Sequence, residues 1–394
     1  MYVRDVYDPL HETWRTAKWL LTEMSIKMSL EEKNIQPLYY IYPMNKKISF
    51  SLISKQHIKY LSKKIKIHEI DEVVIDGLVW TTKRRILLHP ILYITIGDKP
   101  EMFSERVRRL KTVKKVAEKL GGFETCDSDA ISKVATYVLN QFDLIFVPSN
   151  FAKKVLEKCG VQSPIEVLPH GIPEEFMRIG STIISDNIKP ILDIKEKHDA
   201  ILVLFFLMHS GYRKGADLVY KVMKRVQERY KNVYLVVKRG DIIDPYLIPL
   251  RSLKTIEITG FLSTEELRQL YDACDILLCP SRGGGFEMNA LEGISRGLPT
   301  IVPNAGCFLD YIQFAIPVNA PKKVKVFNDN PIHVGYGWEV DLEEFYRVVC
   351  DVIDHLPEYK ERFAKVKYVV HQKYSWKHIC DRLYELLKKH GFVD

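Results

Sequence analysis

The chain has 394 residues, which is too long for one ordinary hydrophobic core, and about two domains are expected. With 46% hydrophobic and 27% charged residues, its composition is that of a globular protein and excludes a disordered or collagen-like chain. The longest apolar run, over residues 200–208, is much shorter than the roughly 20 residues that cross a bilayer. The first ten residues carry charges instead of an apolar signal core, so neither a membrane span nor a signal peptide is expected.

The cysteine content and the charge argue against a disulfide-rich protein and a nucleic-acid-binding protein. Seven cysteines without a C-x-x-C pair indicate neither a disulfide framework nor a zinc site, which fits a reducing, cytoplasmic compartment. The net charge of +8 is concentrated in the N-terminal half, for example over residues 106–119. We interpret these basic runs as solvated helix faces, with a dedicated surface for acidic partners as the alternative. The aromatic and basic spacing of a nucleic-acid module is absent, so no nucleic-acid partner is expected.

The N-terminal half becomes regular after a poorly patterned start. Within the first ninety residues, a helix is predicted over 14–28 and strands over 38–43 and 46–53. From residue 91 onward, apolar β-rich runs alternate with amphipathic stretches, which is the pattern of a mainly parallel sheet covered by helices. The predicted strands are 91–96, 143–148 and 165–168, and the predicted helices are 104–120, 130–140 and 151–159.

A polar, irregular segment over 174–199 is too long for a tight connection, and the domain boundary is placed there. A second α/β series follows it. Its predicted strands are 201–207, 233–238, 256–259, 276–279 and 300–303, and its helices are 214–230, 264–273 and 287–296. The last seventy residues are expected to be helical, with Trp376 near the start of the final helix.

The segment from Cys279 to Glu292 carries the clearest chemical signal. An apolar strand ends, three glycines follow (Gly283 to Gly285), and a helix begins. Glycines let a backbone approach a ligand closely, and the free N–H groups of a helix's first turn attract anions. Phosphate binding is therefore the functional interpretation, and a tight strand-to-helix turn is the structural one. Glu292, one and a half turns into the helix, could accept hydrogen bonds from a ribose diol, or it could be an ordinary surface glutamate.

A second segment, His209 to Asp217, also follows an apolar strand and opens a helix. It places Arg213 and Lys214 where cations could neutralise a diphosphate. Basic residues at a helix start oppose the helix dipole, so a compensating anion is expected nearby.

These segments, together with Gly260-Phe-Leu262, Tyr271-Asp-Ala-Cys-Asp275 and Gly297-Leu-Pro299, resemble the retaining glycosyltransferases of family 4 over roughly residues 140 to 315. The resemblance implies an α/β protein of the GT-B fold, with two Rossmann-like domains facing each other across a cleft. Its expected parts are an acceptor domain over 1–172, a linker over 173–199, a donor domain over 200–365, and C-terminal helices over 366–394 that cross back to the N-terminal domain.

The resemblance also implies roles for residues. Lys214 corresponds to the lysine that binds the donor diphosphate, with Arg213 beside it, and Glu292 corresponds to the second glutamate of the E-x7-E motif, which holds the ribose. The other residues expected around the donor are Ser281, Gly284, Gly285, Phe286, Glu287, Met288, Asn289, His209, Gly260 and Leu262. On the acceptor side, Glu124 resembles part of a cleft-lining segment, and His170 either lines the cleft or is a structural histidine.

Two departures from the family pattern stand out. Position 284, eight residues before Glu292, is glycine where the family usually has its first glutamate, and Glu287 is close by but out of register. The arginine that usually precedes the lysine is replaced by Met208 and His209. Asp127-Ser128-Asp129 has the D-x-D form of metal-dependent transferases, but we interpret it as a helix N-cap and expect no metal or other cofactor.

The expected function is therefore transfer of a hexose-like unit, with retention, from a nucleoside diphosphate sugar to a glycan, a lipid-linked sugar or a glycoprotein. The expected location is cytoplasmic, or peripheral at the inner face of the membrane. The alternatives are a nucleotide-sugar-binding protein without transferase activity and a GT-B-fold sugar epimerase, because a fold alone does not settle function.

Overall fold

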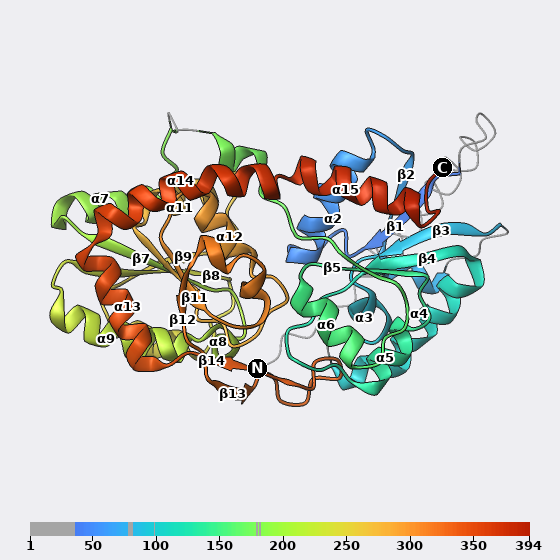
Figure 1. Cartoon of the computed structure of the whole chain (residues 1–394), viewed down its shortest axis with the longest axis horizontal. Coiled ribbons are helices and arrows are strands. Elements are labelled where there is room, and N and C mark those ends of the chain that lie inside the picture. The colour runs from blue at the N-terminus through green and yellow to red at the C-terminus, as the bar shows by residue number, and fades with distance from the viewer. Residues whose placement is uncertain (1–35, 78–81, 98, 179, 181–182) are drawn as a thin grey trace, which may run out of the picture.

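The computed structural model describes residues 36–77, 82–97, 99–178, 180 and 183–394, and shows two α/β domains side by side (Figure 1). Each domain contains a parallel sheet of six strands with helices packed against it. This arrangement confirms the α/β class and the two facing Rossmann-like domains.

The first sheet has the strand order β2-β1-β3-β4-β5-β6, and every neighbouring pair is parallel. Its strands are β1 (Leu38–Tyr42), β2 (Ile67–Asp71), β3 (Arg84–Leu88), β4 (Ala117–Phe123), β5 (Leu144–Val147) and β6 (Ile165–Val167). The helices between them are α2 (Ser49–Leu61), α3 (Ile91–Thr95), α4 (Phe103–Val116), α5 (Lys133–Leu139) and α6 (Asn150–Lys158). Strands β1 and β5 are buried along their whole length, which explains why they read as continuous apolar runs.

The second sheet has the order β12-β11-β10-β7-β8-β9, which is the doubly wound Rossmann order. Its strands are β7 (Ile201–Leu207), β8 (Val233–Arg239), β9 (Thr255–Thr259), β10 (Ile276–Leu278), β11 (Thr300–Pro303) and β12 (Ile316–Val318). Its helices include α8 (Gly211–Lys214), α9 (Ala216–Arg229), α10 (Leu247–Leu250), α11 (Thr264–Ala273), α12 (Met288–Ser295) and α13 (Leu342–Asp354). Helix α11 starts with a capping box, in which Ser263 and Glu266 satisfy each other's backbone N–H groups.

A hairpin of β13 (Lys322–Lys325) and β14 (Tyr336–Glu339) extends from the second domain onto the first. The loop between its strands reaches the segment before α5, where Ser132 N donates to Ile332 O at 2.9 Å. Asp129 is bound from the hairpin by Lys323 at 2.5 Å and by the N–H of Tyr336 at 2.7 Å. The hairpin is thus one of the connections between the domains.

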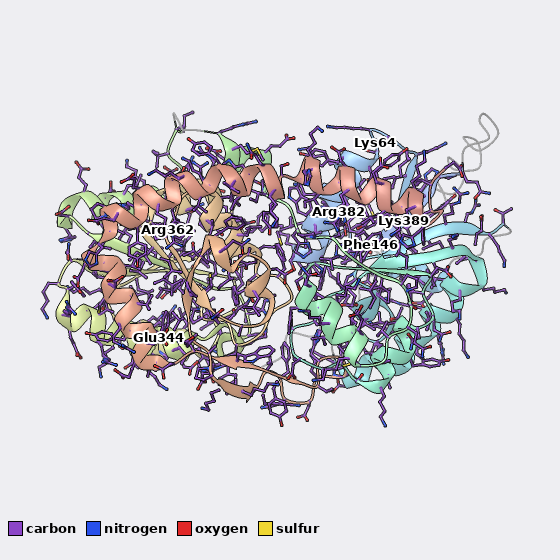
Figure 2. The ribbon with its side chains drawn as sticks, in the orientation of Figure 1. Lys64, Phe146, Glu344, Arg362, Arg382 and Lys389 are labelled. Carbon is purple, nitrogen blue, oxygen red and sulfur yellow. The ribbon has the colours of Figure 1, made fainter. Side chains whose placement is uncertain are left out.

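The second connection is made by the C-terminal helices α14 (Leu356–Tyr374) and α15 (Trp376–Lys389), drawn in red across the top of Figure 1. Helix α14 packs on the second domain and α15 on the first. Lys389 and Lys64, both labelled in Figure 2, lie at the α15 contact. Lys389 donates to Glu166 at 2.8 Å, and Lys64 pairs with Asp381 at 2.7 Å. Between the helices, Tyr374 O accepts from the N–H of Ile172 at 2.6 Å, so the two stretches of chain that pass between the domains are joined to each other.

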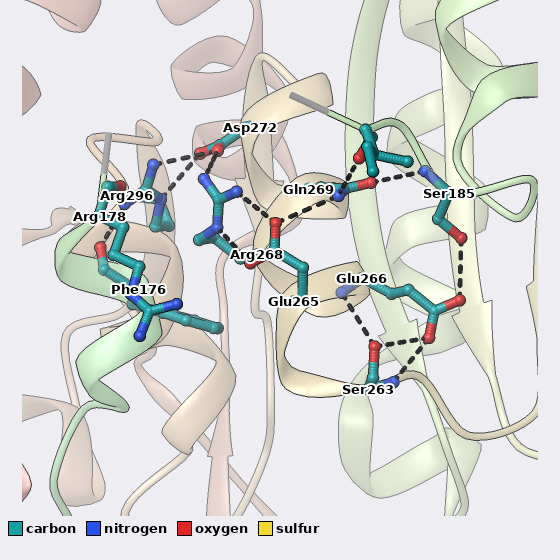
Figure 3. A network of polar contacts seen from close by, with 11 residues as sticks. Phe176, Arg178, Ser185, Ser263, Glu265, Glu266, Arg268, Gln269, Asp272 and Arg296 are labelled. Atoms are coloured by element: carbon teal, nitrogen blue, oxygen red, sulfur yellow. Dashed lines mark hydrogen bonds and ion pairs between the residues drawn. The ribbon is translucent and has the colours of Figure 1, made fainter. Parts of the chain in front are cut away.

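Polar contacts also fix the segment that follows the first domain against α11 and α12 (Figure 3). Arg296 donates to the carbonyl of Arg178 at 2.9 Å, and Ser185 donates to Glu266 at 2.9 Å. The sequence predicted this segment to be irregular, but it contains helix α7 (Lys189–His198), so that expectation was wrong in part.

Three other element predictions were wrong in the first domain, and the helix predicted over 14–28 lies outside the described residues. Residues 91–96 form α3 instead of a strand, because a short apolar run buried on all sides looks the same in either conformation. The strand that precedes it, β3, was not predicted because it begins with the charged residues Arg84-Arg85. Residues 46–53 lead into α2, and the helix predicted over 104–120 ends at Val116, where β4 begins.

We predict that Gly171→Ala destabilises the junction between the domains. A Cβ atom at Gly171 would lie 2.5 Å from Cδ2 of Trp376, whose side chain is fully buried. Because such overpacking costs about 1–3 kcal/mol, the melting temperature should fall. Gly77→Ala is the matched control, because a Cβ atom at Gly77 would have no neighbour within 4 Å among the residues that the structure describes. Equal thermal stability of the two variants would contradict the assigned packing.

Candidate active site

The two segments singled out in the sequence meet because of the strand order. Strands β7 and β10 are neighbours, and the chain leaves them toward opposite sides of the sheet order. Ligands bind at such switch points in open parallel sheets, beyond the carboxyl ends of the strands. Lys214, which follows β7, therefore lies next to the glycine-rich turn that follows β10, and Arg282 N donates to Arg213 O at 2.7 Å between them.

Lys214 is held by a single carboxylate. Its Nζ donates to Oε1 and Oε2 of Glu287 at 2.6 and 2.7 Å. The Glu287 side chain is 2% exposed and that of Lys214 is 19% exposed, so the pair is largely shielded from solvent. Such charge-assisted bonds are about twice as strong as neutral ones.

Of the two neighbouring cations, Lys214 and Arg213, Arg213 is the more deeply buried. Its Nη1 donates to the carbonyl of Gly283 at 2.9 Å and lies 3.5 Å from Oδ2 of Asp127 in the first domain. Its Nε is buried and has no hydrogen-bond partner among the described residues. Although burial opposes ionisation of Asp127, the Arg213 guanidinium holds the pKa of that carboxyl below its ordinary value. The anion that the sequence required near these cations is therefore supplied by the protein itself, through Glu287 and Asp127.

Two glycines of the turn are explained by close neighbours in the first domain. A Cβ atom at Gly283 would lie 2.2 Å from the carbonyl oxygen of Asp127, and one at Gly285 would lie 1.4 Å from Oγ1 of Thr125. The Gly285 carbonyl also accepts from Ser149 Oγ at 2.8 Å. Two of the three glycines are thus required by contact with the first domain, a reason that the sequence did not indicate.

Arg282, within this turn, is neutralised by two carboxylates. The guanidinium binds Asp217 at 2.6 and 2.8 Å and Glu339 at 2.8 and 2.6 Å, and the residue is 2% exposed. Sequence reasoning missed Arg282, since Glu339 lies 57 residues away and no local spacing joins them.

The end of the turn presents a row of free backbone donors. The N–H groups of residues 284–289 donate no hydrogen bond to any described residue, and Ala290 N is the first that does, to Glu287 O at 3.1 Å. Unpaired N–H groups at a helix start form a binding site for oxyanions. This arrangement can hold phosphate oxygens.

Glu292 lies on the buried face of α12. Tyr271 donates its hydroxyl to Oε2 of Glu292 at 2.9 Å. Burial raises the pKa of Glu292 to about 7, while the Tyr271 hydrogen bond lowers it. The residue is thus not an ordinary surface glutamate.

The residues predicted on the acceptor side lie across from the turn. Burial raises the pKa of Glu124 to about 7, although its carboxylate accepts from the N–H groups of Leu92 at 2.6 Å and Thr125 at 2.8 Å. The ring of His170 lies 5.1 Å from that of Phe286, edge to face, and burial lowers the pKa of His170 to about 3. A neutral imidazole therefore faces the turn.

The other residues predicted around the donor have the following places in the second domain. Met288 packs against the cores of both domains, and Asn289 donates to Sγ of Cys279 at 3.5 Å. Ser281 is buried three residues after the end of β10, and His209 is exposed and bonded to the hydroxyl of Ser210. Gly260 and Leu262 follow β9, which lies two strands away from β7 in the sheet.

The D-x-D segment does not cap the helix that follows it. Ser132, not Asp127 or Asp129, caps α5, accepting from Ala135 N at 3.1 Å. Asp127 pairs with Arg213 and Asp129 pairs with Lys323 at 2.5 Å, so both carboxylates serve contacts between the domains. The N-cap interpretation was wrong because the helix starts three residues later than predicted.

A cavity of about 580 Å³ opens beside α8. It is lined by residues that follow β7, residues that follow β8 and the loop of the β13–β14 hairpin, among them Tyr212, Arg213, Asp244, Tyr246 and Phe327. Lys214, Gly285 and Glu292 do not line it. Within the ranges that the structure describes, no helix combines the length and the apolar character that crossing a membrane requires.

Comparisons with known proteins agree with this geometry. Residues 200–322 match the family described as "Glycosyl transferases group 1". A protein of Sulfolobus islandicus filamentous virus, provisionally named glycosyltransferase 45, is 30% identical over 278 residues, covering 67% of this chain and 73% of that protein. An uncharacterized protein of Sulfolobus islandicus rod-shaped virus 1 is 25% identical over 364 residues, covering 90% of this chain and 99% of the relative.

Among solved structures, HepE of Anabaena, determined in complex with UDP and glucose, superposes with a TM-score of 0.64 at 11% identity, covering 90% of this chain and all of HepE. Two Rossmann-like domains that face each other in this way form the GT-B fold. The chain belongs to the glycosyltransferases.

We predict that Glu292 makes stability depend on pH. Its pKa in the folded state is about 7, against an ordinary value of 4.5. Because the folded state holds this proton more tightly than the unfolded chain, ionisation destabilises the fold, and the penalty develops as pH rises from about 4.5 to about 7. At ~1.4 kcal/mol per pKa unit, it is on the order of 3 kcal/mol.

Glu292→Gln removes this titration. In thermal denaturation, the variant should therefore gain stability relative to wild type between about pH 5 and about pH 8. Tyr271→Phe removes a hydrogen bond that lowers the pKa, so it should shift the pH dependence upward. A difference between Glu292→Gln and wild type that is the same at both pH values would show that Glu292 is ionised throughout.

Proposed function

We propose that the chain transfers a hexose-like sugar from a nucleoside diphosphate donor to a carbohydrate-bearing acceptor, with retention of configuration. The observation that carries the proposal is the row of unpaired N–H groups over residues 284–289 beside Lys214 at the switch point. A diphosphate has the negative charge and the oxygen atoms that these N–H groups can bind.

The chemistry follows from where charge develops. Breaking the bond between sugar and diphosphate makes a positively charged, oxocarbenium-like sugar and a leaving group with growing negative charge. Fixed donors aimed at that leaving group lower the barrier, and they need no reorganisation during the reaction. Lys214 and the turn amides supply them, while Arg213 keeps the turn in place through the Gly283 carbonyl.

The donor half of the site extends to Glu292, which we assign to the ribose hydroxyls, and to Gly260 and Leu262 beyond β9. The acceptor is assigned to the first domain, where Glu124 and the neutral His170 face the turn. Retention is consistent with deprotonation of the acceptor by the leaving phosphate, which requires no separate base. We propose a cytoplasmic enzyme, or one peripheral at the inner membrane face, that acts without a metal ion.

We predict that Lys214→Ala lowers kcat for sugar transfer by about 10²–10³-fold, the cost of removing one donor to a developing anion. Lys377→Ala is the matched control, because this lysine of α15 is 74% exposed and pairs with Asp381 on its own helix. Activity is measured over a panel of nucleotide sugars, with release of nucleoside diphosphate as the readout.

Other outcomes of the same panel would decide against the proposal. Donor binding without turnover at any acceptor would indicate a nucleotide-sugar-binding protein, and interconversion of donors without transfer would indicate an epimerase. Full activity of Lys214→Ala would mean that the diphosphate lies elsewhere.

A further inference from the structure

Positions 284 and 287 share one volume. A Cβ atom at Gly284 would lie 2.2 Å from Oε1, 3.0 Å from Cδ and 3.1 Å from Cγ of Glu287. Real Cβ contacts are not that short, so a side chain at position 284 and the carboxylate of Glu287 exclude each other. The carboxylate of Glu287 thus fills the space in which a side chain at position 284 would begin.

The backbone conformations of residues 284 and 287 are the reverse of what their side chains favour. Glu287 has φ 55° and ψ 70°, the left-handed conformation that a glycine adopts freely and that costs other residues about 1–2 kcal/mol. Gly284, in contrast, is not in the left-handed region, so its φ does not require glycine. The chain therefore has its side chain where the backbone favours glycine and its glycine where the backbone does not need one.

Several contacts hold Glu287 in this strained position. Its two carboxylate oxygens accept from Lys214 at 2.6 and 2.7 Å, and its carbonyl accepts from the hydroxyl of Tyr311 at 3.1 Å. Strain of this kind persists where the surroundings fix it, and it is concentrated at functional sites.

We propose that Glu287 provides, from this out-of-register position, the carboxylate that faces the transferred sugar. The inference rests on the proposed function. A donor whose diphosphate binds Lys214 and the amides over 284–289 must place its sugar against the turn, where Glu287 stands. A carboxylate there accepts hydrogen bonds from sugar hydroxyls and opposes the positive charge that grows at the anomeric carbon. In the absence of donor, the same carboxylate neutralises Lys214.

The test is an exchange of the two residues. Glu287→Gly should lower kcat by about 10²-fold or more, and the double variant Gly284→Glu/Glu287→Gly should regain at least about tenfold of that loss, because it returns a carboxylate to the same volume. Asp329→Gly is the matched control, since Asp329 is also left-handed (φ 55°) and lies in the loop of the β13–β14 hairpin. It should leave kcat unchanged.

A second measurement is independent of activity. Gly284→Ala should lower the melting temperature of wild type, because its Cβ would meet the Glu287 carboxylate, but it should be tolerated in the Glu287→Gly background. An equal fall in melting temperature in both backgrounds would contradict the claim that the two side chains occupy the same volume.

The outcomes separate this inference from the proposed function. If Glu287→Gly kept its kcat and bound nucleoside diphosphate more tightly, Glu287 would only neutralise Lys214, and the inference would fail while the transferase assignment stood. If wild type transferred no sugar from any donor, the proposed function itself would fail.

Discussion

The candidate site depends on two ion pairs. Lys214 pairs with Glu287 within the second domain, and Arg213 pairs with Asp127 of the first domain. They place two cations beyond the carboxyl ends of the second sheet and cancel their charge in the absence of a ligand. Removing one partner of such a buried pair leaves an uncompensated charge, which typically costs about 3–5 kcal/mol. In the proposed reaction, a diphosphate that binds Lys214 therefore has to displace the Glu287 carboxylate.

The sequence predicted the strands β7 to β11 of the second domain well, but the last seventy residues, expected to be helical, include the hairpin loop and strand β14. The reason for the success is physical. Buried parallel strands such as β7 are continuous apolar runs, and helices such as α11 begin at a recognisable capping box, so both were located to within a residue. The two candidate segments, both assigned to the donor from the sequence, lie close together because the strand order places the ends of β7 and β10 side by side.

The rest could not be predicted because it depends on contacts between residues far apart in the chain. No spacing rule indicates that Gly285 is glycine because of Thr125, or that Arg282 is neutralised by Glu339. The anion expected near Lys214 was predicted correctly as a requirement but assigned to a ligand, whereas Glu287 also meets it. In the first domain, α3 was mistaken for a strand because burial on all sides removes the helical periodicity.

The most direct test of the central claim is a crystal structure of the chain with a nucleoside diphosphate bound. The account predicts phosphate oxygens within hydrogen-bond distance of Lys214 and of the backbone N–H groups over residues 284–289, with the Glu287 carboxylate moved away from Lys214. A diphosphate bound in the cavity lined by Tyr212 and Tyr246, with the Lys214–Glu287 pair intact, would contradict it.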